Sequence, residues 1–240
     1  MRTAEPPEDQ AELFRGLAAS YDQAIRRYQV AYDAMLDLST DLARVAASGR
    51  SRCLDFGTGT GAALPLLLRS FDQVVAIEPG KPMLDLARNR LTSGAGDVVG
   101  NRVSFVEGTI QSSAARALPE ESFDAVHCSL VLMFVDGDAE KLEVLEFFRR
   151  ILRPGGALVM TDIVVDPDAA TERRCFVQWK DIMRHRGADE DFIAAAERQV
   201  DATMHRRTVA QLGSLLEQTG FRDIEQPFRV LHTVMLLAIK

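Results

Sequence analysis

Eight residues constrain this chain more than any other stretch, because an acid and three alternating glycines follow an apolar run there without interruption. The stretch reads Leu54-Asp55-Phe56-Gly57-Thr58-Gly59-Thr60-Gly61. Glycine lacks Cβ, so this spacing lets the backbone turn sharply from a strand into a helix and brings its N–H groups within reach of a ligand. Gly57, Gly59 and Ala62 also satisfy the pattern G-x-G-x-x-G/A, so the sequence predicts a nucleotide-cofactor loop without deciding which cofactor it holds.

Two acids beside the loop narrow the choice of cofactor. Asp55 is expected to face the ligand, where a carboxylate suits an ammonium or a sulfonium better than a pyrophosphate. Glu78 ends the next apolar run, Val74 to Ile77, at the sheet edge where α/β proteins bind ligands. A carboxylate there can accept hydrogen bonds from both hydroxyls of a ribose. Glu78 fits any nucleoside cofactor, whereas Asp55 favours a cationic one, S-adenosylmethionine, over a nicotinamide or a flavin.

Strand-like and helix-like segments alternate through the middle of the chain. We expect strands at 52–56, 74–77, 103–106, 123–130 and 157–164, and helices from the glycine loop to residue 69, at 81–91 and at 139–151. This alternation predicts βαβ units and a mostly parallel sheet. Upstream, residues 8–47 have helical spacing, with Leu13, Leu17, Tyr21 and Ile25 on one face. Downstream we expect helical segments at 168–210 and 212–219 and late strands at 224–228 and 230–239.

These segments predict one domain over residues 1–240, a length that allows one α/β core with a modest cap. Its expected parts are an N-terminal helical cover (1–50), a cofactor-binding core (51–166), a helical cap (167–210), and a C-terminal helix with the last strands (211–240). The apolar runs are all far shorter than the ~20 residues of a membrane helix. The first twenty residues lack the apolar core of a signal peptide, so we expect a cytoplasmic protein without membrane contact.

Charge and cysteine content limit the partners of the chain. Its 28 Lys and Arg against 35 Asp and Glu give a net charge of −7, which argues against nonspecific nucleic-acid binding. The cysteines Cys53, Cys128 and Cys175 form no C-x-x-C pair, so we expect buried thiols and no metal site. A small-molecule partner and a monomer or homodimer are the expectation.

Four motifs, in order and in register, resemble the class I S-adenosylmethionine-dependent methyltransferases. They are Leu54 to Gly61, Val74 to Glu78, Phe123-Asp124-Ala125-Val126 and Leu152-Arg153-Pro154-Gly155-Gly156. The resemblance implies a Rossmann-like, doubly wound, mostly parallel seven-stranded sheet with N-terminal helices and a helical cap inserted after strand 5. It implies S-adenosyl-L-methionine as cofactor and S-adenosyl-L-homocysteine as product. A short-chain dehydrogenase would need a Tyr-x-x-x-Lys pair after the fourth strand, and the tyrosines, Tyr21, Tyr28 and Tyr32, all precede the glycine loop.

The resemblance also implies cofactor-binding roles at the matching positions. Glu78 matches the acid that binds the ribose, and Tyr21 resembles a tyrosine that closes over the cofactor in many small-molecule members. Thr109 stands where many relatives carry an aspartate for the adenine amino group, so Thr109 itself or a backbone group has to replace that contact. The remaining implied contacts are Asp55, Gly57, Thr58, Gly59, Gly61, Ser129 and Leu130 for the methionine part, and Pro79, Met83, Gly108 and Ile110 around the adenine.

The predicted activity is in-line methyl transfer to an oxygen, nitrogen or carbon of a small molecule, such as a secondary metabolite. The sulfonium already activates the methyl group, so the protein mainly positions the reactants and excludes water. We expect the acceptor pocket to include Arg26, Tyr32, Met133 and Trp179. Trp179 also belongs to an apolar stripe with Phe176 and Met183, whose spacing fits the docking of a helix onto the core. No catalytic base is assigned, and of the histidines, His127, His185, His205 and His232, the first is expected to be a core residue of the fourth strand.

Three other functions stay open. RNA as the acceptor would need a basic stripe assembled from Arg173, Arg174, Arg184, Arg186, Arg206 and Arg207. A narrower resemblance, in Arg26-Arg27-Tyr28, Tyr32-Asp33 and the C-terminal stretch from Gly220-Phe221 to Lys240, is to the branch that contains the wobble-uridine carboxy-S-adenosylmethionine synthases. The third is a cofactor sensor that turns nothing over.

Overall fold

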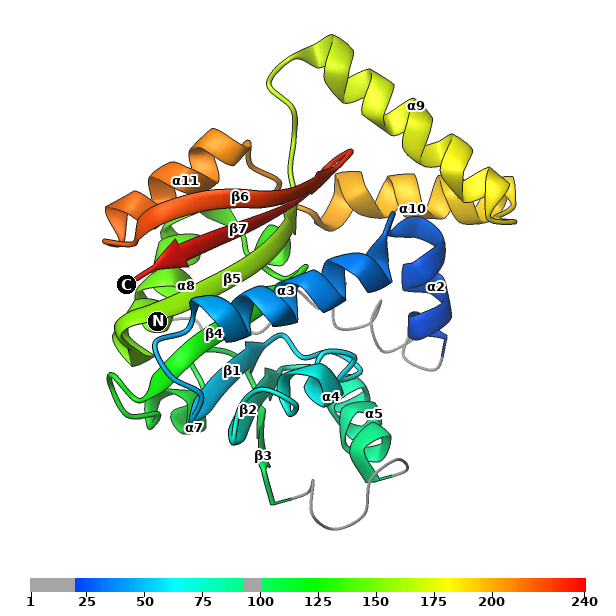
Figure 1. Cartoon of the computed structure of the whole chain (residues 1–240). Helices are drawn as coiled ribbons and strands as arrows, with labels where there is room; N and C mark the ends of the chain where they lie inside the picture. The colour runs from blue at the N-terminus through cyan, green and yellow to red at the C-terminus, as the bar shows by residue number, and fades with distance from the viewer. Residues whose placement is uncertain (1–19, 93–100) are drawn as a thin grey trace.

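A seven-stranded sheet forms the centre of the described part of the protein, residues 20–92 and 101–240 of a computed structural model (Figure 1). Its strand order is β3-β2-β1-β4-β5-β7-β6. The strands are β1 (Arg52–Phe56), β2 (Gln73–Glu78), β3 (Val103–Glu107), β4 (Phe123–Ser129), β5 (Leu152–Ile163), β6 (Arg222–Val230) and β7 (Thr233–Ile239).

Helices connect the strands and cover both faces of the sheet. They are α2 (Tyr21–Tyr28), α3 (Tyr32–Ala46), α4 (Leu64–Leu67), α5 (Lys81–Thr92), α7 (Ser113–Arg116), α8 (Gly137–Ile151), α9 (Ala169–His185), α10 (Glu190–Thr203) and α11 (Val209–Gln218), with a 3₁₀ turn, η1, at Leu132–Phe134. None of the helices in the described ranges is long and apolar enough to cross a membrane.

The strand directions confirm the predicted doubly wound, mostly parallel sheet. β1 pairs in parallel with β2 and β4, β2 with β3, and β4 with β5, whereas β7 runs antiparallel to both β5 and β6. The chain builds outward from β1 to β3 and then returns to the other side of β1 with β4. The carboxyl ends of β1 and β4 therefore flank the topological switch point, where open α/β sheets form their ligand crevice.

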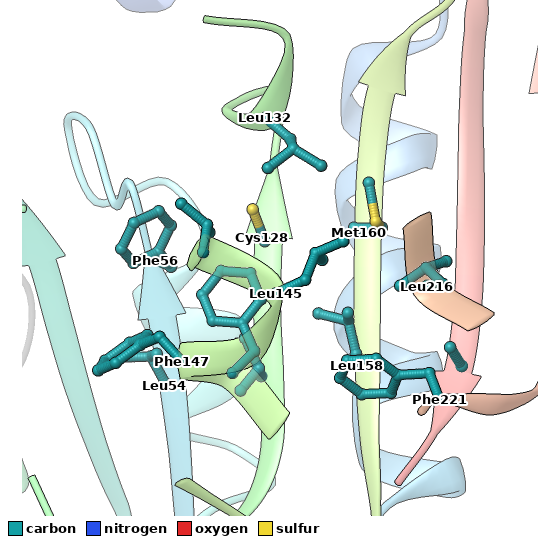
Figure 2. Close-up of a cluster of buried hydrophobic side chains, with 14 of the residues drawn as sticks. Leu54, Phe56, Cys128, Leu132, Leu145, Phe147, Leu158, Met160, Leu216 and Phe221 are labelled. Carbon is teal, nitrogen blue, oxygen red and sulfur yellow. The ribbon is translucent and has the colours of Figure 1, made fainter. Parts of the chain in front are cut away.

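Side-chain alternation along the strands produces two apolar layers. In β1, Leu54 and Phe56 face the layer formed with α8 and α11 (Figure 2). Phe56 packs edge-on against Phe148, with ring centroids 5.0 Å apart. Cys53, which directly precedes Leu54, faces the opposite layer, formed with α3, α4 and α5. All three cysteines are buried free thiols, as predicted.

The cap is present as predicted, while several element boundaries differ from the expectation. Helices α9 and α10 follow β5, and Figure 1 shows them beyond the end of the sheet, next to α2. The expected N-terminal helix is broken after α2, because Ala31 adopts a left-handed conformation with φ of 57°. Leu13 and Leu17 lie outside the described residues. The helix after the glycine loop ends at Leu67 rather than residue 69.

Two further boundaries were predicted wrongly at the C-terminal half of the sheet. β5 begins at Leu152 and includes Pro154-Gly155-Gly156, because Phe123 of β4 already pairs with Leu152 across an irregular register. Val230 belongs to β6 instead of the last strand, since it pairs with Thr233 next to the turn.

Candidate functional site

The glycine loop occupies the switch point, directly after β1. Its first two N–H groups, of Gly57 and Thr58, donate to the carbonyl of Ile77 at 2.8 and 3.0 Å, which fixes the loop against β2. Gly61 has φ of +76°, and a Cβ there would lie 2.9 Å from Cβ of Ala87, so α5 packs directly on the loop. A Cβ on Gly59 would meet nothing within 4 Å. The middle of the loop thus leaves backbone open to a ligand.

Glu78, at the end of β2, joins the two loops that follow β1 and β2. One carboxylate oxygen accepts from the N–H of Gly59 at 3.0 Å and the other from the N–H of Gly80 at 2.8 Å. Burial raises the pKa of Glu78, and these two N–H groups act against that rise. Each oxygen keeps a further lone pair, so the carboxylate can accept additional hydrogen bonds from a bound diol.

Asp55 is held in a buried chain of hydrogen bonds. Its Oδ1 lies 2.8 Å from Nδ1 of His127, and its Oδ2 accepts from the hydroxyl of Thr58. The other ring nitrogen of His127 lies 2.9 Å from Oγ of Ser39, whose hydroxyl is also 2.9 Å from the carbonyl of Leu36 in α3. Asp55 is 2% exposed and His127 1%. His127 is a core histidine, as expected, and it orients the acid of the loop.

Helix α2 is fastened to the glycine loop through Asp22. Its carboxylate accepts from the hydroxyl of Thr60 at 2.6 Å and pairs with Arg90 of α5. Arg90 in turn donates to the carbonyl of Thr60 at 2.9 Å. Asp22, the neighbour of the predicted site residue Tyr21, thus holds α2 against the loop.

A hollow with about 420 Å³ of empty space, part of it open to solvent, lies over the glycine loop and beneath α2 and α3; we term it the loop cavity. Eight of the predicted site residues line it: Tyr21, Tyr32, Asp55, Gly57, Thr58, Gly59, Ser129 and Leu130. Sequence reasoning missed the other lining residues, Leu36, Thr60, Ala62, Ala63 and His127. Leu36 and His127 carry no motif of their own, and only tertiary packing brings them to the loop.

The predicted adenine contacts lie outside this cavity, at the tips of β2 and β3. The N–H of Gly108 donates to the carbonyl of Glu78 at 3.0 Å, which keeps the two tips together. Thr109 Oγ1 accepts from the N–H of Gln111 at 3.3 Å. Met83 is buried in α5, Pro79 is exposed, and Ile110 packs on the core.

The four predicted acceptor residues do not form one pocket. Arg26 is exposed, pairs with Asp33 at 2.9 Å and lies over the ring of Tyr32, which lines the loop cavity. Met133 is buried in η1. Trp179 lines a separate cavity under the cap and donates its indole N–H to the carbonyl of Tyr28 at 2.6 Å.

A buried lysine supports the segment after β4, which borders the site. Lys141 is fully buried and donates to the carbonyls of Leu132, at 2.7 Å, and Val135. Nearby, Asp162 accepts from the N–H groups of Met133 and Ile163 at 3.1 and 3.0 Å. Burial raises the pKa of Asp162 to about 7 and lowers that of Lys141 to about 8. Both groups hold the turn in place, and neither is among the residues that line the loop cavity.

Comparison with known proteins places these features in a family. A methyltransferase-domain model matches residues 54–160, from the glycine loop through most of β5. An uncharacterized methyltransferase of Geobacillus kaustophilus (strain HTA426) is 29% identical over 211 residues, which cover 88% of this chain and 87% of that protein. A carboxy-S-adenosyl-L-methionine synthase of Campylobacter lari is 23% identical over 98% of this chain and 97% of its own.

A solved structure shares the whole fold. The DhpI-SAM-HEP complex superposes with a TM-score of 0.63 at 19% identity, over 99% of each chain. At that identity the likeness concerns the fold alone, and the domain match and the sequence relatives carry the assignment. The strand order, the glycine loop after β1 and the acid after β2 agree with it. The chain is therefore an enzyme of the class I S-adenosylmethionine-dependent methyltransferase family.

Proposed function

We propose that the protein binds S-adenosylmethionine across the loop cavity and the tips of β2 and β3, and transfers its methyl group to a small-molecule oxygen, nitrogen or carbon. The observation that carries this proposal is the pair of acids at the switch point, Asp55 and Glu78, beside the open backbone of Gly59. The cofactor supplies an electrophilic methyl on a sulfonium. The chain's own residues then have to bind, orient and exclude water.

The geometry of the two acids suits the two ends of such a cofactor. Glu78 has a lone pair left on each oxygen for the ribose hydroxyls. Asp55 has both oxygens already bonded, so it acts on the cationic methionine part mainly through its charge and through the loop that it holds. Tyr21, from α2, and Ser129 and Leu130, from the end of β4, complete the walls of the methionine side.

A small acceptor is favoured over RNA because four of the six arginines of the suggested basic stripe are engaged elsewhere: Arg184, Arg186, Arg206 and Arg207. Arg184 pairs with Asp181 and Glu190, at 2.8 and 2.6 Å. Arg206 and Arg207 pair with Glu172 and Asp138 in the same way. Arg186 donates to main-chain carbonyls of the α2 segment. Such pairing removes the free positive charge that phosphate binding needs.

Three buried free thiols suit a reducing compartment, and we propose the cytoplasm as the location of the protein.

Calorimetric titration tests the cofactor. Wild type, Glu78→Gln and a control, Glu225→Gln, which changes an exposed acid on β6, are titrated with S-adenosylmethionine, S-adenosylhomocysteine and NADH. A glutamine has one acceptor oxygen for donors that the carboxylate serves with two. We expect Glu78→Gln to weaken binding of both adenosyl ligands about 10- to 100-fold, and Glu225→Gln to leave it unchanged. Binding of NADH, or equal affinities in all three proteins, would contradict the proposal.

A product assay separates methyl transfer from the alternatives. Purified protein is incubated with S-adenosylmethionine and either pooled small metabolites or bulk tRNA, and the products are identified by mass spectrometry. We expect S-adenosylhomocysteine with a methylated metabolite, at a rate that salt leaves unchanged. Turnover on tRNA that falls steeply with salt, or a carboxylated S-adenosylmethionine, would replace the proposed acceptor class.

A further inference from the structure

The turn between β4 and α8 packs directly on the glycine loop. We term residues 130–136 the β4–α8 turn. Its first residue, Leu130, lines the loop cavity and has a left-handed backbone with φ of 58°. A Cβ on Gly57 would collide with the side chain of Val131, which leaves no space between the turn and the loop. A shift of the turn would therefore change one wall of the site proposed for the methyl donor.

The cap is attached to the same turn. The carbonyl of Met133 accepts from the N–H of His205, just after α10, at 2.7 Å. Nδ1 of His205 also lies 3.1 Å from Oδ1 of Asp136, and Arg207 pairs with Asp138, at the start of α8, at 2.7 Å. Movements of the cap thus reach the turn, and the glycine loop stays undisturbed only where the turn is held from the core.

Two buried charged side chains hold the turn from the core. Lys141, in α8, donates to the carbonyls of Leu132, at 2.7 Å, and Val135. Asp162, near the end of β5, accepts from the N–H of Met133 at 3.1 Å. A cation thus binds carbonyls, and an anion binds an N–H, of one short turn. These bonds satisfy buried backbone groups that would otherwise lack partners.

Lysine is an unusual residue for this position. Lys141 is fully buried, and Figure 2 shows its partner Leu132 among the apolar side chains beside α8. Burying a charged group costs folding free energy, and apolar side chains of similar volume often replace such groups without loss of stability. An apolar side chain cannot, however, donate to the two carbonyls. The lysine therefore serves the conformation of the turn, at a site where plain packing would fill the core.

We propose that Lys141 and Asp162 are positioning residues of the cofactor site. By fixing the β4–α8 turn, they keep Leu130 and Val131 in place against the glycine loop and so set the affinity for S-adenosylmethionine. Neither Lys141 nor Asp162 lines the loop cavity, so both act through the turn. The inference rests on the proposed function, because it concerns the affinity for that cofactor.

Calorimetric titration with S-adenosylhomocysteine tests this role in paired variants. Lys141→Met keeps the length of the side chain but removes the donor. Asp162→Leu removes the acceptor, whereas Asp162→Asn keeps an oxygen that can accept from the N–H of Met133. The control, Leu216→Ala, truncates a fully buried residue of α11 and so destabilises the core without removing a hydrogen bond from the turn.

The contact with the glycine loop is tested in the same titrations. Val131→Ala removes most of the side chain that packs on Gly57. In the Val131→Ala background, Lys141→Met should weaken binding clearly less than it does in wild type, because the contact through which it acts is already lost. Circular dichroism establishes which variants are folded. Where Lys141→Met does not fold, the Asp162 pair and Val131→Ala decide the question.

Lys141→Met, Asp162→Leu and Val131→Ala should bind S-adenosylhomocysteine about 5- to 30-fold more weakly than wild type. Asp162→Asn and Leu216→Ala should keep the affinity of wild type. Wild-type affinity in Asp162→Leu or Val131→Ala, or weakening of Leu216→Ala to the same extent, overturns the inference. A wild-type protein that does not bind the ligand refutes the proposed function itself, whereas binding that is equal in all variants refutes the positioning role alone.

Discussion

Replacing His127 by leucine tests whether the acid of the glycine loop depends on its buried partner. The leucine fills a similar volume, so the principal loss is the imidazole that bridges Asp55 and Ser39. Asp55 keeps its bond from Thr58 but has no other donor for Oδ1 at a position that is 2% exposed. Leaving a buried carboxylate oxygen without its donor costs about 1–3 kcal/mol of folding free energy.

A double-mutant cycle with Ser39→Ala sharpens this prediction. Ser39→Ala alone should cost about 1 kcal/mol, because it deletes one hydrogen bond at a buried position. In the His127→Leu background it should cost clearly less, since the ring that Ser39 contacts is already absent, so the two effects are not additive. The exposed residue His185, on α9, supplies the control His185→Leu, which should change stability by no more than ~0.5 kcal/mol.

Urea unfolding followed by circular dichroism measures these differences, provided that all variants share one m-value. A loss below about 1 kcal/mol for His127→Leu, or strict additivity with Ser39→Ala, would refute the reasoning that Asp55 relies on this chain of bonds. Total stabilities of such domains are about 5–15 kcal/mol, so the predicted loss is a large fraction of the whole and is readily resolved.

Two further predictions concern buried charges. Burial raises the pKa of Glu78 in the folded protein, so folding favours the protonated carboxyl. The stability that this group contributes is complete at pH values below its pKa in the unfolded chain. It is lost as the pH rises through its pKa in the folded protein. Thermal melts of wild type and Glu78→Gln should therefore show that wild type loses stability relative to the variant as the pH rises above ~4.3. A difference in melting temperature that does not change with pH would contradict the raised pKa of Glu78. Lys141→Met should lower the free energy of unfolding, measured by urea titration, by about 2–5 kcal/mol, because the carbonyls of Leu132 and Val135 lose a buried donor. A loss under ~1 kcal/mol would show that water replaces the lysine as donor.

The parts of the site that depend on local spacing were predictable from the sequence. The loop from Gly57 to Gly61 and the acid Glu78 each follow an apolar strand at a fixed interval, and strand ends of a parallel sheet meet at one edge. The contacts made between distant segments were not predictable. Ser39 and His127 are 88 positions apart, and neither stands in a pattern that indicates the other.

The acceptor region shows the same limit. Trp179 was named for an acceptor pocket and for helix docking. In the structure it donates to the carbonyl of Tyr28 and lines a cavity under the cap, and its role toward an acceptor stays a prediction. Ala31 takes a left-handed conformation that is uncommon for a residue other than glycine, so the local sequence did not indicate the break between α2 and α3.

Helix α2 is fastened at both ends, to the glycine loop and to the cap, and this couples the two sides of the helix. Its first turn is tied to the glycine loop through Asp22 and Thr60, and its last turn accepts the indole N–H of Trp179 from the cap. Arg186 adds bonds from the end of α9 to the carbonyls of Arg26 and Gln29. Any movement that lifts α2 from the glycine loop must also disturb its contacts to the cap. The loop side and the cap side of the helix therefore open together rather than independently.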